Sequence, residues 1–330
     1  MKLNSTPAAL SLALAQTRSL VTTPAAGSDT KAKPKPSKRM QERIGVIGAG
    51  MMGEALIRGF INSGISSPGR ISCSVDALER RQLYEGMGVG NVFDAAELGG
   101  AAGVAANSDI VVLAIKPQVI QPVLDALAPH LTPRHLVVSI AAGIRLARME
   151  AALGPGTRVV RVMPNTPCLV QCGASAYALG SAATQRDADL VRELLGSVGL
   201  AMEVDEKMVS LTVVVAGRVA VVVMDAVTGL SGSGPAFAFL VIEALADGGV
   251  AAGLPRNTAL ALAAKTMAGA AAMVLESGAG SLTHPGVLKD KVASPGGTTI
   301  AGLMELESSG VRGAVMRAVK AAAIRSEELG

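Results

Sequence analysis

The stretch "RIGVIGAGMMGEALIRGFINSG", residues 43–64, decides the fold that this sequence predicts. An apolar run typical of a buried strand leads into Gly48, Gly50 and Gly53, and a segment with helical periodicity follows. Between a strand and a helix, this glycine spacing is typical of a dinucleotide-binding turn. Gly48 would permit the tight turn, Gly50 would let a pyrophosphate approach the backbone, and Gly53 would let helix and strand pack closely. A turn without a ligand is the alternative.

Further apolar runs follow at the spacing of alternating strands and helices. They cover residues 70–75, 109–117, 135–143 and 157–165. Each run is rich in β-branched residues and nearly continuous, as strands of a parallel sheet buried on both faces require. The sequence therefore predicts an α/β, Rossmann-like, doubly wound parallel sheet over residues 43–205. Such sheets bind ligands at the carboxyl ends of their strands.

The end of the second predicted strand bears on the choice of cofactor. Ser74 lies at the tip, Asp76 follows, and Arg80 and Arg81 come next. An acidic residue at this tip favours NAD, whereas a serine with nearby arginines accepts a 2′-phosphate. Asp76 could instead be a solvated turn residue. The pattern favours NADPH, with NADH as the alternative.

The pattern changes to Ala-rich helices in the second half, residues 224–330. Long apolar stretches cover 225–255 and 257–277, and Pro235 is expected to kink the first of them. Their small-residue faces are too apolar for the exterior of a monomer, which indicates burial against a partner subunit. We therefore expect an all-α dimerisation domain.

Near the end of the chain, "SPGGTT" at 294–299 precedes another helical segment. The N–H groups of Gly297, Thr298 and Thr299 would lie in the first turn, where no intrahelical partner exists and the helix dipole favours an anion. This arrangement predicts a cradle for a carboxylate or phosphate. A plain N-cap at Thr298 or Thr299 is the alternative.

Composition limits the other possibilities. The chain of 330 residues carries a net charge of +4, but residues 1–39 hold seven Lys/Arg and one acid, which is +6 and leaves −2 for the rest. A nearly neutral body argues against a nucleic-acid surface. Three cysteines provide neither a disulfide framework nor a metal site.

The leader, residues 1–42, is rich in Ser/Thr and poor in acids, and we expect it to be disordered. It resembles an organelle transit peptide, and its few arginines favour a plastid over a mitochondrion. A secretory signal and a tail on a cytoplasmic protein are the alternatives.

Taken together, "VIGAGMMGEALIRGF", "AIKPQ", "VMPNTP", "DAVTGLSGSGPAF", "ADGGVAAGLP" and "HPGVLKDKVASPGGTT" resemble pyrroline-5-carboxylate reductase. The resemblance runs from about Arg43 to the C-terminus and implies hydride transfer from NAD(P)H to the C=N carbon of 1-pyrroline-5-carboxylate, giving L-proline. It also implies a homodimer, commonly assembled into a ring, without nucleic-acid or membrane partners. An imine needs no strong general acid, so none of His130, His135 and His284 has to be catalytic. His284 is expected to cap or pack in a turn.

The resemblance also implies site residues. The substrate carboxylate would lie on Ser294, Gly297, Thr298 and Thr299, and the catalytic Thr299 would hydrogen-bond the ring nitrogen. The cofactor would be held by Gly48, Ala49, Gly50, Met51, Met52, Ser74, the segment Ala114 to Pro117 with Lys116, the turn Ala141, Ala142 and Gly143, and Asn165. Ala101 stands where the family often has an asparagine, which puts one adenosine contact in doubt.

A second departure is the valine-rich segment "VSLTVVVAGRVAVVV", residues 209–223, which family members lack. It is strand-like on both sides of Ala216-Gly217, so we expect an insertion that forms a hairpin and has no catalytic role. Two rival functions remain at this point. One is another two-domain NADP oxidoreductase, although Lys265, Lys289 and Lys291 have no asparagine at helical spacing. The other is a non-catalytic nucleotide-binding regulator.

Overall fold

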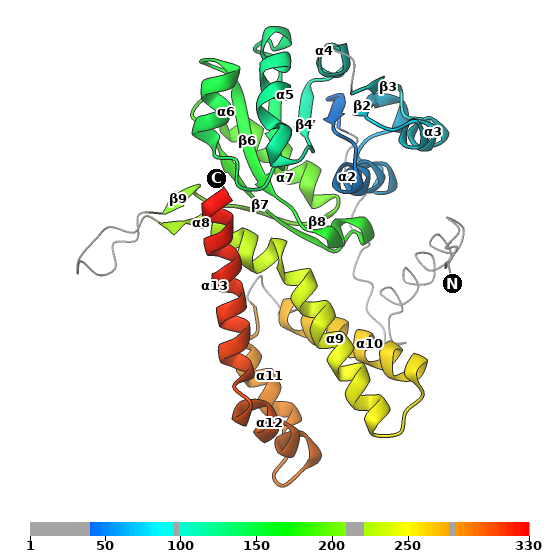
Figure 1. Ribbon diagram of the computed structural model, residues 1–330, viewed down its shortest axis with the longest axis vertical. Coiled ribbons are helices and arrows are strands. Elements are labelled where there is room, and N and C mark those ends of the chain that lie inside the picture. Colours follow the sequence, from blue (N-terminus) through cyan, green and yellow to red (C-terminus); the bar gives the residue numbers. More distant parts are fainter. Residues whose placement is uncertain (1–39, 96–98, 209–220, 277–281, 330) are drawn as a thin grey trace, which may run out of the picture. The chain divides into compact units, whose positions relative to one another are not determined.

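A computed structural model describes residues 40–95, 99–208, 221–276 and 282–329. The predicted leader lies outside these residues up to residue 39, and most of the predicted insertion also lies outside them. The chain divides into two compact units (Figure 1). The first contains the residues up to Val227 and those from Ser326 onward, and the second contains Thr228–Arg325. Met40 is buried in the first unit and its N–H donates to the Ile65 carbonyl (2.9 Å), so the fold already includes the end of the segment predicted as leader.

The first unit is built on an eight-stranded sheet in the order β3-β2-β1-β4-β5-β6-β7-β8. Neighbouring strands are parallel except β6 and β7, which are antiparallel. The strands are β1 Ile44–Ile47, β2 Ile71–Val75, β3 Asn91–Asp94, β4 Ile110–Leu113, β5 Leu136–Ser139, β6 Arg158–Met163, β7 Gly173–Leu179 and β8 Gly199–Glu203. The α-helices are α2 Met51–Asn62, α3 Leu78–Gly86, α4 Gly99–Ala106, α5 Ile120–Leu127, α6 Leu146–Leu153, α7 Gln185–Gly196 and α8 Val223–Val227. The predicted Rossmann-like fold is confirmed.

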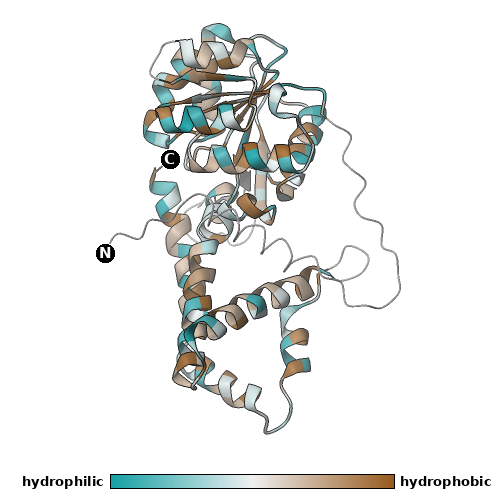
Figure 2. Cartoon of the chain, turned by 90° about the vertical axis from the view of Figure 1, so that its right-hand side faces the viewer, coloured by the Kyte–Doolittle hydropathy of each residue, from teal (hydrophilic) through white to brown (hydrophobic). Residues whose placement is uncertain are grey.

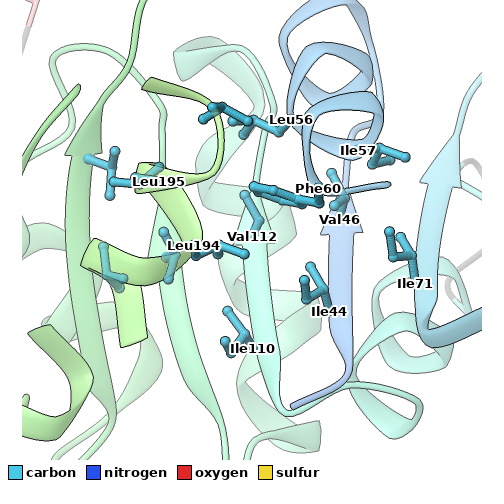
Figure 3. Close-up of a cluster of buried hydrophobic side chains, with 14 of the residues drawn as sticks. Ile44, Val46, Leu56, Ile57, Phe60, Ile71, Ile110, Val112, Leu194 and Leu195 are labelled. Carbon is cyan, nitrogen blue, oxygen red and sulfur yellow. The ribbon is translucent and has the colours of Figure 1, made fainter. Parts of the chain in front are cut away.

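Alternating side chains of the central strands fill two apolar cores, one on each face of the sheet. On one face Ile44 and Val46 pack with α2, α3 and α7, as the close-up in Figure 3 shows for Phe60, Leu194 and their neighbours. On the other face the strands pack with α4, α5 and α6. Burial on both faces explains why each strand reads as a continuous apolar run.

The base of the predicted insertion is described. Strand β9, Lys207–Met208, pairs antiparallel with β10, Val221–Val222. This pairing is what a hairpin requires at its base, and residues 209–220 of the predicted hairpin lie outside the described part of the chain.

The second unit consists of helices. They are α9 Gly234–Ala251, α10 Arg256–Leu275, α11 Pro285–Val292, α12 Thr298–Ser308 and α13 Val311–Leu329, of which the last four residues belong to the first unit. A π-helical turn, Thr228–Gly232, separates α8 from α9. The expected kink at Pro235 is wrong, because this proline lies in the first turn of α9, where its missing N–H removes no helical hydrogen bond.

Few side chains of the second unit are buried. Ala246, Ala259 and Ala263 form its small core between α9 and α10. Large apolar side chains such as Phe239 and Leu240 are 64% and 69% exposed. Figure 2 shows brown stretches along the long helices, interrupted by white and teal ones. Two helical stretches, Val223–Ala251 and Arg256–Leu275, are long and apolar enough to cross a membrane, with mean hydropathies of 1.4 and 1.6. By length and composition alone, this is weak grounds for a membrane span.

Candidate functional site

The glycine-rich turn after β1 has the geometry of a dinucleotide site. Gly48 adopts φ +82°, and a Cβ there would lie 2.2 Å from Ile115 Cγ2. A Cβ on Gly53 would lie 3.1 Å from the Gly48 carbonyl oxygen, so this glycine allows α2 and the turn to pack closely. Gly50 differs, because a Cβ there would meet no protein atom within 4 Å. Protein packing therefore does not require glycine at position 50. The open space would let a bound ligand approach the backbone there.

The same turn leads into the N-terminus of α2. Gly50 is the N-cap residue and provides no capping side chain. The N–H groups of the first turn, from Met51 onward, have no intrahelical partner and carry the positive end of the helix dipole. Met51 is 74% exposed. The residues present thus fit a pyrophosphate, which backbone N–H groups and the dipole would hold.

Three hydrogen bonds fix the turn from neighbouring elements. The Gly48 N–H donates to Ser74 Oγ (3.3 Å) and the Ala49 N–H donates to the Ser74 carbonyl (3.0 Å). The Tyr84 hydroxyl, on α3, donates to the Ala49 carbonyl (2.8 Å). Ser74 is only 1% exposed, so its hydroxyl positions the turn from beneath. Burial raises the pKa of the Tyr84 phenol, which keeps it a hydrogen-bond donor.

Tyr84 was not predicted from the sequence. It lies 35 residues from Ala49, and only the folded chain brings the two together. Its one sequence signal is that it is one of two tyrosines, placed on an amphipathic helix after the second strand.

Charged residues surround the tip of β2. Asp76 is exposed. Arg80 forms an ion pair with Glu54, which also binds Arg58 (2.7 Å). Among the residues that the structure describes, the Arg81 side chain has no hydrogen-bond or ion-pair partner. Arg81 is thus the arginine at this tip that is available to an added anion.

The remaining predicted cofactor residues lie at the carboxyl ends of β4, β5 and β6. These strands are parallel and adjacent to β1, so their ends meet at one edge of the sheet. Ala114 to Pro117 follow β4, with Lys116 exposed, and Ala141 to Gly143 follow β5, with Gly143 at φ +77°. Asn165 follows β6 and is 8% exposed, and its Oδ1 accepts the Ala174 N–H (2.9 Å).

Ala101 lies on α4. It packs, partly buried, against the apolar core on its side of the sheet. A methyl group cannot replace the hydrogen bonds of an asparagine amide, so Ala101 itself offers no polar contact to an adenosine.

The second unit contains the glycine-threonine stretch in a different form from the one expected. Ser294 to Gly297 form a β-turn, in which the Gly297 N–H donates to the Ser294 carbonyl (3.1 Å) and Gly296 adopts φ +66°. Proline followed by a glycine with positive φ is typical of a type II turn. The expectation of a free Gly297 N–H is therefore wrong, because the turn consumes it.

Gly297 is the N-cap residue of α12, so the expected alternative of a cap at either threonine is also wrong. The first-turn N–H groups without an intrahelical partner are those of Thr298, Thr299 and Ile300. Thr298 is exposed and Thr299 is half-buried. These N–H groups can donate hydrogen bonds to a small carboxylate, and the Thr299 hydroxyl belongs to the same turn.

Two of the histidines make local hydrogen bonds. His284 caps α11 by accepting the Gly286 N–H (3.1 Å), as expected. His135 is buried, its Nδ1 accepts the Thr132 N–H (2.8 Å), and its Nε2 lies 3.1 Å from the Ala105 carbonyl oxygen and 3.3 Å from Arg134 Nε. In the described part of the chain no three His, Cys, Asp or Glu residues gather as a metal site.

A cavity of about 240 Å³ lies at the amino end of the sheet, beside Ile110, Leu136 and Arg158, which begin their strands. Two of its charged lining residues, Asp109 and Arg158, are paired with residues outside the lining. The Arg43 guanidinium holds the pKa of Asp109 below its usual range, and Arg158 binds Asp187 (2.6 Å). This cavity is thus at the opposite edge from the glycine-rich turn.

Known proteins with a similar sequence decide the family. The family model "Pyrroline-5-carboxylate reductase dimerisation" matches residues 222–329, and "NADP oxidoreductase coenzyme F420-dependent" matches residues 43–143. A pyrroline-5-carboxylate reductase of Arabidopsis thaliana is 48% identical over 288 residues, which are 87% of this chain and 95% of the relative. The chain belongs to the pyrroline-5-carboxylate reductase family. A reductase of Methanosarcina acetivorans is 47% identical, over 88% of this chain and 98% of the relative.

Solved structures agree with this assignment. A Plasmodium falciparum pyrroline carboxylate reductase with NADP bound has a TM-score of 0.74 and 31% identity, over 89% of this chain and all of that one. A Coxiella burnetii pyrroline-5-carboxylate reductase has a TM-score of 0.75 and 33% identity, over 88% of this chain and 99% of that one. The likeness covers both units, so the rival assignment to another two-domain NADP oxidoreductase is not supported. The chain is an oxidoreductase.

Proposed function

We propose that this enzyme reduces 1-pyrroline-5-carboxylate to L-proline, the last step of proline biosynthesis, using NADPH, with NADH as a possible substitute. One observation carries the proposal. The chain joins a turn with open space at Gly50 to a separate helix start at Thr298 and Thr299, and relatives that share both units are named for this reaction. The cofactor, when bound, supplies hydride to the imine carbon of the substrate.

The first unit binds the cofactor. The backbone from Gly48 to Met52 holds the pyrophosphate, and Ser74 keeps the turn in place. The segments Ala114 to Pro117 and Ala141 to Gly143, with Asn165, line the same sheet edge and orient the rest of the molecule. Arg81 supports NADPH over NADH, because its guanidinium has no partner among the described residues and matches a 2′-phosphate. Asp76 stays in solvent.

The second unit binds the substrate by its carboxylate. The N–H groups of Thr298 and Thr299 donate to the two oxygens, and the dipole of α12 stabilises the negative charge. Ser294 and Gly297 contribute the turn that exposes them, since a Cβ on Gly297 would lie 2.4 Å from Ser294 Oγ. The Thr299 hydroxyl hydrogen-bonds the ring nitrogen.

The chemistry is mainly positioning. Protonation of the ring nitrogen makes the imine carbon electrophilic, and the product amine keeps that proton. Thr299 or water holds it in place, so no strong general acid is required. Catalysis then depends on proximity and on neutralising one carboxylate.

We also propose that the enzyme is a homodimer, assembled further into a ring, which binds neither membranes nor nucleic acid. The mostly apolar groove of about 580 Å³ between α9 and α10, lined by Phe239, Leu240 and Leu260 with Glu243 as its charged residue, suits a second copy. Glu243 and Asp247 interrupt the apolar surface of α9, which disfavours lipid on that helix. The leader supports import into a plastid, with the cytoplasm or a mitochondrion as alternatives.

The test is oxidation of NADPH by the purified full-length chain, followed at 340 nm with and without 1-pyrroline-5-carboxylate. We expect oxidation only with the substrate, and proline as the product by mass spectrometry. Tight NADPH binding without turnover would instead support the non-catalytic regulator.

The insertion, residues 209–223, is proposed to have no catalytic role.

A further inference from the structure

Four polar residues meet in the interior of the first unit and are not used by the proposed chemistry. Arg161 on β6 is 3% exposed and forms ion pairs with Glu206 (2.9 Å) and Asp225 (3.7 Å). The Ser326 hydroxyl donates to the same Asp225 oxygen (2.8 Å). We call Arg161, Glu206, Asp225 and Ser326 the clasp. Burying charged groups costs desolvation free energy even when they are paired, so a buried ion-pair network suggests a structural or functional role.

The positions of these residues along the chain suggest that reason. Asp225 comes two residues before Val227, where the chain leaves the first unit, and Ser326 is the residue at which it returns. We call these two points, where the chain passes from one unit to the other, the crossings. The Asp225 carboxylate therefore lies at one crossing and binds the residue at the other. Arg161 anchors that carboxylate to the sheet, since β6 is paired on both sides.

The clasp also reaches the cofactor edge. The Leu146 N–H, at the first residue of α6, donates to the same Glu206 oxygen that Arg161 binds (2.9 Å). Helix α6 begins directly after the loop that contains Ala141 to Gly143, which the proposed function assigns to the cofactor. Arg161 thus connects, through two carboxylates, the start of α6 with both crossings.

We propose that the clasp positions the substrate-binding unit for hydride transfer, by fixing where the chain leaves and re-enters the cofactor-binding unit. This inference rests on the proposed function. Arg161, Asp225 and Ser326 are positioning residues in this account and contact neither cofactor nor substrate. Loosening the clasp should therefore lower turnover and leave cofactor affinity nearly unchanged.

The test compares Ser326→Ala and Ser326→Thr in the full-length enzyme. Ser326→Ala should lower kcat/KM for 1-pyrroline-5-carboxylate about tenfold, while the Kd for NADPH stays within about twofold. Ser326→Thr keeps a hydroxyl and should recover most of the loss. Asp225→Asn should lower kcat/KM further. Asp189→Ala breaks an exposed ion pair with Arg192 on α7 and serves as the control, with no effect.

Hydrogen exchange provides a readout that does not depend on activity. Amides of residues 223–232 and 320–329 should exchange about fivefold faster in Ser326→Ala than in the wild type or in Asp189→Ala. Unchanged exchange and turnover in Ser326→Ala and Asp225→Asn would overturn the proposal, as would a parallel loss of NADPH affinity. A wild-type enzyme that does not turn over the substrate would contradict the proposed function instead, and the exchange data would still decide whether the clasp holds the crossings.

Discussion

The first unit buries most of its large apolar side chains, whereas the second leaves most of its own in contact with solvent. In the first unit, strands β1, β4 and β5 are buried along their whole lengths, between two helical layers. In the second unit the residues of the core proper are three alanines. Because burial of apolar surface is the main driving force for folding, the first unit has a sufficient core and the second requires another surface. The difference supports the proposed homodimer, in which a second copy would cover the exposed apolar side chains of the second unit.

The largest expected effect comes from charging the apolar surface of α9. The double substitution Phe239→Glu and Leu240→Glu should abolish dimerisation, because two carboxylates cannot be buried unpaired at an interface. We expect the mass in light scattering to fall from that of the ring, a multiple of the dimer mass, to the 33.2 kDa of one chain, or the chain to aggregate. Turnover should be lost in either case. Leu78→Glu changes a 70% exposed leucine of the first unit and is the matched control. A dimer that survives the double substitution would show that another surface joins the subunits.

The next effect separates two glycines of the same turn. Gly48→Ala forces a side chain onto a backbone at φ +82° and against Ile115, which should cost roughly 1–3 kcal/mol of stability as well as NADPH binding. Gly50→Ala meets no protein atom, so it should leave the melting temperature unchanged and weaken NADPH binding at least tenfold. Calorimetry measures the melting temperature, and fluorescence titration measures the affinity for NADPH. NADPH bound normally by Gly50→Ala would show that the pyrophosphate lies elsewhere.

These glycines also show what the sequence could and could not predict. The glycine spacing and the apolar runs predict the turn, the sheet and its ligand-binding edge, because local sequence pattern determines them. The Tyr84 hydroxyl on Ala49 could not be predicted, since that contact exists only after α3 packs on the sheet. The antiparallel β7 was likewise not predicted, because an apolar run does not indicate the direction of a strand.

The second unit was predicted less well, for a physical reason. The sequence identifies a helix start at Thr298 but does not show which N–H groups a preceding turn consumes, and Gly297 was assigned wrongly. The clasp was also missed, because Arg161 lies between valines in a mostly apolar strand and its partners are 45 and 64 residues away. Buried ion pairs between distant segments leave no periodic signal.

A smaller effect tests the role of Thr299 in the proposed substrate site of the second unit. Thr299→Ala removes one hydrogen bond to the ring nitrogen and should cost about 1–3 kcal/mol, or up to roughly two decades in kcat/KM. Thr299→Ser keeps the hydroxyl and should retain most activity. NADPH affinity and dimer mass should not change in either variant, since the cofactor and the interface depend on other residues. Unchanged turnover in Thr299→Ala would show that this hydroxyl has no chemical role.

The smallest effect concerns the surface of the self-sufficient unit. Arg43 binds Asp109 through its backbone N–H (2.9 Å) and its guanidinium (3.0 Å), which lowers the pKa of Asp109 in the folded state. A lowered carboxyl pKa contributes stability that is present above the unfolded value, near 4, and is lost as the pH falls through the folded value. The side chains are 37% and 28% exposed, so solvent screening limits this contribution to about 1 kcal/mol.

Asp109→Asn should therefore lower the free energy of unfolding by about 1 kcal/mol or less at pH 7, and by less still as the pH falls through the lowered pKa of the wild-type carboxylate. Urea unfolding at a fixed protein concentration from pH 3 to pH 7 measures the difference between the two proteins. Arg192→Met, which removes exposed ion pairs of α7, is the control for a pair whose partners are more exposed. A difference of several kcal/mol, or one that grows as the pH falls, would contradict the account in which the apolar core rather than its charged surface stabilises the first unit.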